Sequence, residues 1–232
     1  MYKTFEMKEI GHIKSDFPEK FGIPRQSGLV KELKAQIIFE PEFSDVNAFK
    51  GLEGFSHIWI LWKFSKALRE NWSPQVRPPR LGGNKYMGVF ATRSPFRPNP
   101  LGLSCVKLDK IEQDKKLGVI LHISGADLMD GTPIFDIKPY IPYADSYPDA
   151  LGGFTDETPK PTLKVVFEDN CDGVLEEEKR LGLIGVLAQD PRPAYQNNPE
   201  KIYVMDFAEY EIKFLVNEDT LTVKNIVKNG EK

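Results

Sequence analysis

Two aspartates, Asp127 and Asp130, lie three residues apart in the segment 124–133, which also holds two glycines. Glycines at these positions allow a compact turn, and such a turn lets backbone amides and carboxylates approach a small molecule. The alternative is an ordinary Asp-Gly turn with no function of its own. The residue types favour a binding or acid–base site only if other segments supply complementary groups.

Arginines held by prolines form a second group of interest. Arg25 lies between Pro24 and Gln26 in a loop opened by a glycine, and Arg192 has a proline on each side and follows Asp190 closely. Proline restricts the neighbouring backbone, so the guanidinium can be directed at a carboxylate or phosphate with little loss of entropy. A loop arginine is more often only solvated, and each of these is weak evidence alone.

The stretch 71–108 contains no Asp or Glu, although acids make up 34 of the 232 residues of the chain. Cations and aromatic residues alternate within it, which is the pattern that a phosphate-bearing partner requires. A solvated, proline-rich surface loop is the alternative. The cations are Arg77, Arg80, Lys85, Arg93, Arg97 and Lys107, and the aromatic residues include Trp72, Tyr86, Phe90 and Phe96.

Metal and common cofactor motifs are missing from the sequence. His12, His57 and His122 have no second His or Cys at a ligand spacing, so we expect no metal site. No phosphate-binding loop, dinucleotide-binding glycine motif or serine nucleophile motif is present. His57 enters an apolar segment, where it is either a hydrogen-bonded core histidine or a base.

Composition limits the class of protein. The 31 Lys and Arg against 34 Asp and Glu give a net charge of −3, which excludes a polybasic protein that binds nucleic acid by bulk charge. Cys105 and Cys171 form no CxxC motif, and we expect free thiols. The charged start of the chain and its short apolar runs predict no signal peptide and no membrane span, hence a cytoplasmic protein.

The elements that must position these residues are short. The 18 prolines and 18 glycines interrupt the chain often. We expect a mainly β protein: a β-barrel-like domain over 1–150 and a small α+β domain over 151–232. The expected strands are 5–14, 33–42, 55–64, 85–92, 102–108, 117–124, 132–140, 163–168, 201–216 and 220–227, with helices at 43–54 and 174–187.

Eight short motifs, taken together and in order, resemble the TsaA-like family over nearly the whole chain. Each is weak alone, but their order is highly specific. They are Pro24-Arg-Gln26, Gly54-Phe-Ser-His-Ile-Trp59, Arg77-Pro-Pro-Arg-Leu-Gly-Gly83, Gly88-Val-Phe-Ala-Thr-Arg-Ser94, Arg97-Pro-Asn-Pro100, Asp127-Leu-Met-Asp-Gly-Thr-Pro133, Asp136-Ile-Lys-Pro-Tyr140 and Asp190-Pro-Arg-Pro-Ala-Tyr195.

The resemblance implies an S-adenosylmethionine-dependent methyltransferase acting on N6 of threonylcarbamoyladenosine, the modified base just 3′ of a tRNA anticodon. It implies a single-sheeted β-barrel rather than a Rossmann fold, and a homodimer. By match to the family's motifs, the methyl donor would lie among Pro24, Arg25, Gln26, His57, Ile58, Arg93, Leu103, Asp127, Leu128, Met129 and Asp130.

The resemblance also implies roles in catalysis and substrate binding. Asp127, Asp130 and His57 are the candidate bases, and the motifs leave the choice among them open. Arg192 is the candidate reader of the substrate's threonine carboxylate. The anticodon loop, with its phosphates, would be bound by Arg77, Arg80, Arg97, Asn99, Lys138, Tyr140, Asp190, Arg192 and Tyr195.

Two other functions remain open from the residues alone. One is a non-catalytic barrel that binds a nucleotide or RNA, because no residue is an unmistakable nucleophile or metal ligand. The other is a methyltransferase of the same fold acting on a small molecule, since barrels serve many functions. The C-terminal motif that begins at Asp190 argues against the second, because a small-molecule enzyme would not need it.

Overall fold

The structure of the chain is a computed structural model. It describes residues 4, 6–66, 71–156, 163–171, 173–193, 196 and 198–230, except for the side chain of Arg80. The predicted substrate residue Tyr195 lies outside the described residues.

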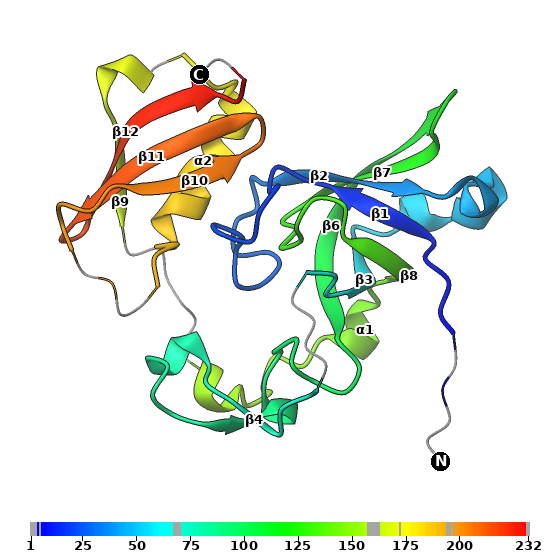
Figure 1. Cartoon of the computed structure of the whole chain (residues 1–232). Helices are drawn as coiled ribbons and strands as arrows, with labels where there is room; N and C mark the ends of the chain where they lie inside the picture. The colour runs from blue at the N-terminus through cyan, green and yellow to red at the C-terminus, as the bar shows by residue number, and fades with distance from the viewer. Residues whose placement is uncertain are drawn as a thin grey trace.

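A closed barrel of six strands forms the first part of the chain (Figure 1). Every neighbouring pair in it is antiparallel. Alternate residues point inward, as in β3, where Ile58 and Ile60 are fully buried. In barrel order the strands are β1 (Gly11–Lys14), β2 (Lys34–Phe39), β7 (Gly118–Ser124), β6 (Leu101–Asp114), β3 (His57–Lys63) and β8 (Pro133–Pro139).

The acid-free stretch leaves the barrel after β3 and returns at β6. Between β3 and β6 it lies in the lower part of Figure 1, around β4. Its regular structure is a two-stranded ribbon of β4 (Gln75–Val76) and β5 (Met87–Gly88), with single 3₁₀ turns at Pro79–Leu81 and Val89–Ala91. A short α1 (Pro142–Asp145) and a 3₁₀ turn (Gly153–Thr155) follow β8.

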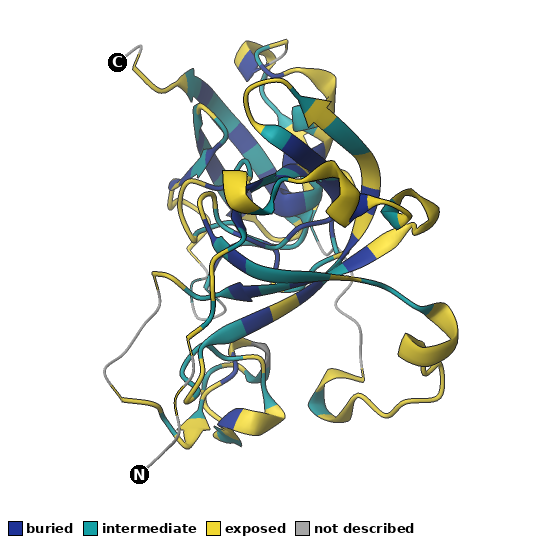
Figure 2. Cartoon of the chain, turned by 90° about the vertical axis from the view of Figure 1, so that its right-hand side faces the viewer, coloured by how far each residue is buried: buried dark blue, intermediate teal, exposed yellow. Residues whose placement is uncertain are grey.

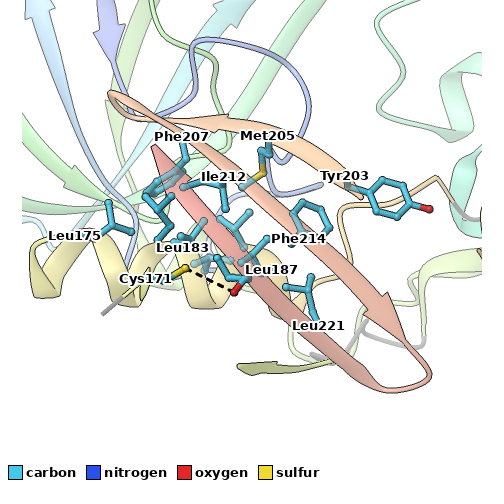
Figure 3. Close-up of a cluster of buried hydrophobic side chains, with 14 of the residues drawn as sticks. Cys171, Leu175, Leu183, Leu187, Tyr203, Met205, Phe207, Ile212, Phe214 and Leu221 are labelled. Carbon is cyan, nitrogen blue, oxygen red and sulfur yellow. Dashed lines mark hydrogen bonds between the residues drawn. The ribbon is translucent and has the colours of Figure 1, made fainter. Parts of the chain in front are cut away.

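The C-terminal part is a four-stranded sheet covered by one helix (Figure 1). The strand order is β10 (Tyr203–Phe207), β11 (Tyr210–Asn217), β12 (Thr220–Lys228) and β9 (Lys164–Phe167), and only β12 and β9 are parallel. Helix α2 (Glu177–Ala188) packs its buried residues into the core of this sheet, which Figure 3 shows in close-up. A 3₁₀ turn (Asp169–Cys171) follows β9.

The segment between β1 and β2 connects the two parts. Phe17, Val30 and Leu33 lie before β2 in the chain, yet they are buried in the core of the C-terminal sheet. The Phe17 ring meets that of Phe207 edge-on at 5.6 Å. On α2, a Cβ added to Gly185 would stand 2.5 Å from Val30, so the helix can lie this close only with glycine there.

Several expected elements differ from those observed. The expected helix 43–54 is three 3₁₀ turns (Pro41–Phe43, Val46–Phe49, Leu52–Gly54), because Gly51 takes a positive φ of 90° and interrupts it. The expected strand 85–92 is strand only at β5, and 201–216 is two strands because Ala208 turns with a φ of 53°. The hairpin at 217–220 is confirmed.

Burial follows the strands rather than the connecting segments (Figure 2). The most exposed large apolar side chains lie outside the two sheets' cores, with Tyr143 91% and Leu151 93% exposed. Within the ranges that the structure describes, no helix is long and apolar enough to cross a bilayer.

Candidate functional site

An edge of β6 that β7 does not pair with provides the place for the site. The pairing of β6 with β7 stops where Lys107 faces Ser124, whereas its pairing with β3 continues to Leu101. The segment 101–106 therefore has one edge that β7 does not cover. The loop 20–29 and the turn that follows β7 fill this edge, and they contact each other through a hydrogen bond of 2.8 Å from Gly28 N to Gly125 O.

Side-chain hydrogen bonds fix Asp127 at this edge. The Ser104 hydroxyl donates to Asp127 Oδ1 at 2.6 Å, and it accepts at 3.0 Å from Trp62 Nε1. Ser27 contributes a backbone hydrogen bond to Asp127, and its hydroxyl accepts from Cys105 N at 3.2 Å. The carboxyl is therefore held by one inward residue of β6 and by the loop 20–29.

The pKa of Asp127 is raised above its ordinary value. Burial is the largest cause, and the hydrogen bond from Ser104 and the charge of Arg93 oppose it without cancelling it. A carboxylate of raised pKa is a better proton acceptor than a solvated one.

Arg93 brings the acid-free stretch to this edge. Its Nη1 donates to Gln26 Oε1, and its charge acts on Asp127. The guanidinium remains exposed. Three of the predicted donor-binding residues, from three distant segments, are thus in one cluster, with an anionic and a cationic group at its centre.

The remaining residues of the turn have different surroundings. Asp130 is exposed, and its Oδ1 accepts from Ser15 N at 2.9 Å, so it also fixes the turn to the end of β1. Leu128 is 1% exposed within the barrel core, as is Ile58 at 0%. These two residues support the site from inside the barrel, and Met129 is only partly buried.

His57 stands on the outer face of the barrel. Its ring lies 6.3 Å from that of Tyr140, and its Nδ1 is 2.9 Å from the Ser56 hydroxyl. Of the two alternatives for His57, the core histidine is wrong, because the side chain is exposed where it enters β3. Leu103, 53% exposed, and Lys138 lie on this same outer face, opposite Leu61 and Trp59 respectively.

A cavity of about 150 Å³ lies between the loop 20–29 and the C-terminal end of α2. Pro24, Arg25 and Asp190 line it. Gly22 also lines the cavity and lets the loop lie close to β10, since its φ is +94° and an added Cβ would stand 2.2 Å from Met205 Sδ.

Arg192 is 9% exposed and pairs with Asp190. Nε and Nη2 donate to the two carboxylate oxygens at 2.8 and 2.9 Å, and this bonding raises the pKa of the guanidinium. A substrate carboxylate would have to use Nη1 or displace Asp190. Asp190, two residues after the end of α2, takes a positive φ of 51°, which turns the chain sharply at this motif.

The predicted phosphate-binding residues follow the acid-free stretch. Arg77 is exposed with its guanidinium 4.4 Å from the ring centroid of Tyr86, and Arg97 donates to Thr92 O at 3.3 Å. Asn99 is exposed. For Arg80 the structure describes the backbone, which lies in the 3₁₀ turn after Pro78.

Sequence reasoning missed Ser27, Ser104 and Trp62. The one available signal was Ser104, a hydroxyl at an inward position of an apolar strand, which needs a buried partner. Among the residues that the structure describes, no group of three or more His, Cys, Asp or Glu could hold a metal. The expected absence of a metal stays a prediction.

Comparison with known proteins gives two family models that match in order. Residues 12–146 match the tRNA-methyltransferase O N-terminal domain, and residues 160–229 match the TrmO C-terminal domain. A tRNA (adenine(37)-N6)-methyltransferase from Escherichia coli strain K12 is 44% identical over 93% of this chain and 94% of its own. One of the same name from Eikenella corrodens is 48% identical over 75% of this chain and 97% of its own.

The similarity to solved structures extends over nearly the whole chain. A crystal structure of TrmO covers 97% of this chain and 100% of its own, with a TM-score of 0.80 and 34% identity. A structure of TrmO from Pseudomonas aeruginosa covers 97% and 99%, with a TM-score of 0.81 and 33% identity. The similarity thus includes both the barrel and the C-terminal sheet.

Proposed function

The chain belongs to the tRNA-methyltransferase O family, and on this premise we propose that it methylates N6 of adenosine 37 in tRNA with S-adenosylmethionine as donor. Relatives whose length it matches carry the name tRNA (adenine(37)-N6)-methyltransferase. The structural observation that supports this proposal is the cluster of Gln26, Arg93 and Asp127 at the edge of β6 that β7 does not pair with.

The residues of this cluster suit the methyl donor chemically. S-adenosylmethionine, when bound, supplies an electrophilic methyl group on its sulfonium. The Arg93 guanidinium can pair with the donor's carboxylate, and Asp127 or Asp130 can accept hydrogen bonds from ribose hydroxyls or the amino group. Exposed apolar surface at Leu103 lies on the outer face of β6, near the point where Ser27 meets that strand.

Methyl transfer needs donor and acceptor held in line, and positioning supplies much of the rate. The acceptor N6 has a delocalised lone pair, so removing its proton in the transition state raises its nucleophilicity. We assign this role to Asp127, because its pKa is raised by burial and Ser104 fixes its orientation. Asp130, already bonded to Ser15, and His57, on the outer face, are the alternatives.

The form of the adenosine is a finer proposal. We propose threonylcarbamoyladenosine as the acceptor, with the cavity beside Arg25 and Asp190 taking the threonylcarbamoyl group. Arg192 would read the threonine carboxylate through Nη1 while Asp190 holds its other nitrogens. The Arg192→Ala variant should lose more binding affinity for modified than for unmodified tRNA, and an equal loss for both would remove this role.

The test of the function combines transfer with donor binding. Labelled methyl donor is incubated with tRNA that carries or lacks the threonylcarbamoyl group, and nucleosides are analysed by mass spectrometry. Label only in the modified tRNA is the expected result. Calorimetry of donor binding should show a loss for Arg93→Ala and for Asp127→Ala, and unchanged affinity in both would overturn the site. No transfer to either tRNA would favour a non-catalytic RNA-binding barrel.

We also propose a homodimer in the cytoplasm. Tyr143, Tyr147 and Leu151 are 91%, 75% and 93% exposed within nine positions, and apolar surface of this kind is typical of contacts between chains. The solution mass should be that of a dimer, and it should fall to that of a monomer in the variant Tyr143→Ser/Tyr147→Ser/Leu151→Ser. A wild-type monomer at micromolar concentration would overturn the proposal.

A further inference from the structure

The acid-free stretch carries a pair of stacked aromatic rings that its own fold leaves uncovered. The rings of Trp72 and Phe90 have centroids 6.3 Å apart and planes 24° apart. Trp72 is 50% exposed and Phe90 is 72% exposed. Burying such rings would normally stabilise the fold, so their exposure points to a partner outside the chain.

The pair is mounted on a fixed scaffold. Backbone hydrogen bonds join the two arms of the stretch, from Val89 N to Pro74 O at 3.0 Å and from Ser73 N to Phe96 O at 2.9 Å. The side chain of Val89, the neighbour of Phe90, is 1% exposed and anchors this turn. The two rings are therefore held in place before any partner binds, which lowers the entropic cost of stacking on them.

Positive charge surrounds the rings. The Arg97 guanidinium lies 6.0 Å from the centroid of Phe90, and the Arg77 guanidinium lies 4.4 Å from that of Tyr86, itself 55% exposed. No acidic residue occurs between Asn71 and Leu108. Exposed aromatic rings among arginines match single-stranded nucleic acid, whose bases stack on the rings while its phosphates meet the cations.

The rings lie near the reacting centre. Phe90 precedes Arg93 by three residues, and three residues of chain span at most about 11 Å. Arg93 in turn contacts Gln26 and acts on Asp127. A base stacked on this pair would thus belong to the same loop of RNA as the adenosine at the site.

We propose that Trp72 and Phe90 form a stacking platform for an unpaired base of the tRNA anticodon loop close to the methylated adenosine. This inference rests on the proposed function, and it adds a group that recognises the base rather than the phosphates. Stacking is tolerant of base identity, so the platform contributes affinity and placement at many tRNA sequences.

The experiment measures the coupling between the rings and one base, without methyl donor. Anticodon stem-loop RNAs with a single abasic residue at each loop position are bound to wild type and to Trp72→Ala/Phe90→Ala at constant salt. We expect one loop position at which base removal weakens wild-type binding about 10- to 100-fold and leaves the variant's affinity unchanged. Additive losses at every position would overturn the platform.

Two further variants control for folding and for general loss of apolar surface. Trp72→Leu/Phe90→Leu keeps the apolar bulk but removes both π faces, and it should bind like the alanine variant. Leu117→Ala removes a side chain that is 49% exposed at the β6–β7 turn, outside the stretch, and should bind like wild type. If instead the leucine variant binds like wild type, stacking is not the interaction.

Parallel measurements separate the possible failures. A change of oligomeric state in Trp72→Ala/Phe90→Ala would assign these rings to a contact between copies of the chain and overturn the platform. Methyl transfer by wild type without any ring–base coupling would refute the platform alone. Coupling without transfer to any tRNA would refute the proposed function alone.

Discussion

Asp127 is the residue at which function and stability oppose each other. Burial is the main cause of the raised pKa of its carboxyl group, so ionising this group at neutral pH lowers the stability of the folded chain. Because the pKa of Asp127 is higher in the folded than in the unfolded chain, its protonated form stabilises the fold. This stabilisation is full at low pH and is lost as the pH rises through the folded-state pKa. The hydrogen bonds from Ser104 and Ser27 limit this cost and orient the group.

The variant Asp127→Asn should therefore be less active but no less stable. Asparagine keeps an oxygen that can accept from Ser104 and removes the buried charge. We expect kcat to fall about 100- to 10,000-fold, as for loss of a general base, and Tm at pH 8 to equal or exceed that of wild type. Any gain in Tm should vanish near pH 3. A strongly lower Tm at pH 8 would contradict this account.

The motifs indicated which candidate site residues lie together, but not which residues surround them. Gln26, Arg93 and Asp127 come from three motifs and meet at one edge. The contacts of Ser27 and Ser104 with the site depend on where the pairing of β6 with β7 ends, at Lys107. No local pattern in the sequence marks that point. Register between distant strands is a tertiary property, which local sequence does not encode.

At the scale of elements, a bulge ties three barrel strands together next to the site. The β6–β7 register shifts between Leu108 and Lys110, and Asp109 is the extra residue. Lys34 of β2 contacts its Oδ2 at 2.9 Å, Lys107 contacts its Oδ1 at 3.0 Å, and Ser124 of β7 donates to it. Burial opposes ionisation, but these partners prevail and lower the pKa of Asp109 to about 2.

Removing this charge should destabilise the barrel only where the carboxylate is ionised. Because the folded pKa is lowered, the stabilisation is full above pH 4 and is lost as pH falls toward 2. Asp109→Asn should cost about 1–2 kcal/mol in the free energy of unfolding at pH 7, allowing for solvent screening. Urea titrations at pH 7 and pH 2.5 test this, and an equal difference at both would refute the ion-pair explanation.

Gly22 sets how closely the loop 20–29 approaches β10. Gly22→Ala adds a Cβ 2.2 Å from Met205 Sδ at a φ of +94°, whereas Gly28→Ala has a φ of +77° with nothing within 4 Å. We expect unfolding free energy to fall by about 1 kcal/mol for Gly28→Ala and about 2–3 kcal/mol for Gly22→Ala. Equal losses would mean that contact with Met205 is not limiting. In a Met205→Ala background, the losses caused by Gly22→Ala and Gly28→Ala should become equal.

Elements with clear periodicity were predictable, and those without a partner in the sheets were not. β2, β3, β7 and the hairpin after Asn217 follow the expected ranges closely. The stretch 85–92 has strand-like composition but pairs only at β5, because the prolines around it supply no long partner strand.

At the scale of the whole molecule, charge is distributed more unevenly than its sum of −3 indicates. The acid-free stretch carries exposed cations such as Arg77, and around β4 it lies in the lower part of Figure 1. A molecule of this kind is repelled weakly by RNA overall but attracts it at one face, so binding should depend on salt through a few local contacts.

Salt dependence should therefore localise the RNA face. For anticodon stem-loop RNA, the slope of log K against log salt should fall in magnitude by about 1 in Arg77→Gln and in Arg97→Gln. Lys116→Gln changes an exposed cation at the β6–β7 turn and should leave the slope as in wild type. A slope insensitive to both arginines, or equally sensitive to Lys116, would place the RNA elsewhere.

The packing of Phe17, Val30 and Leu33 into the C-terminal core has a consequence for cutting the gene in two. Chains 1–150 and 151–232, each made alone, would expose complementary apolar surfaces and should aggregate. Made together, they should assemble into a split protein without a covalent link, because Lys179 also pairs with Asp16 at 2.7 Å across the cut. Co-purification of an untagged half with a tagged one would measure this complementation, and independent, soluble, monomeric halves would contradict it.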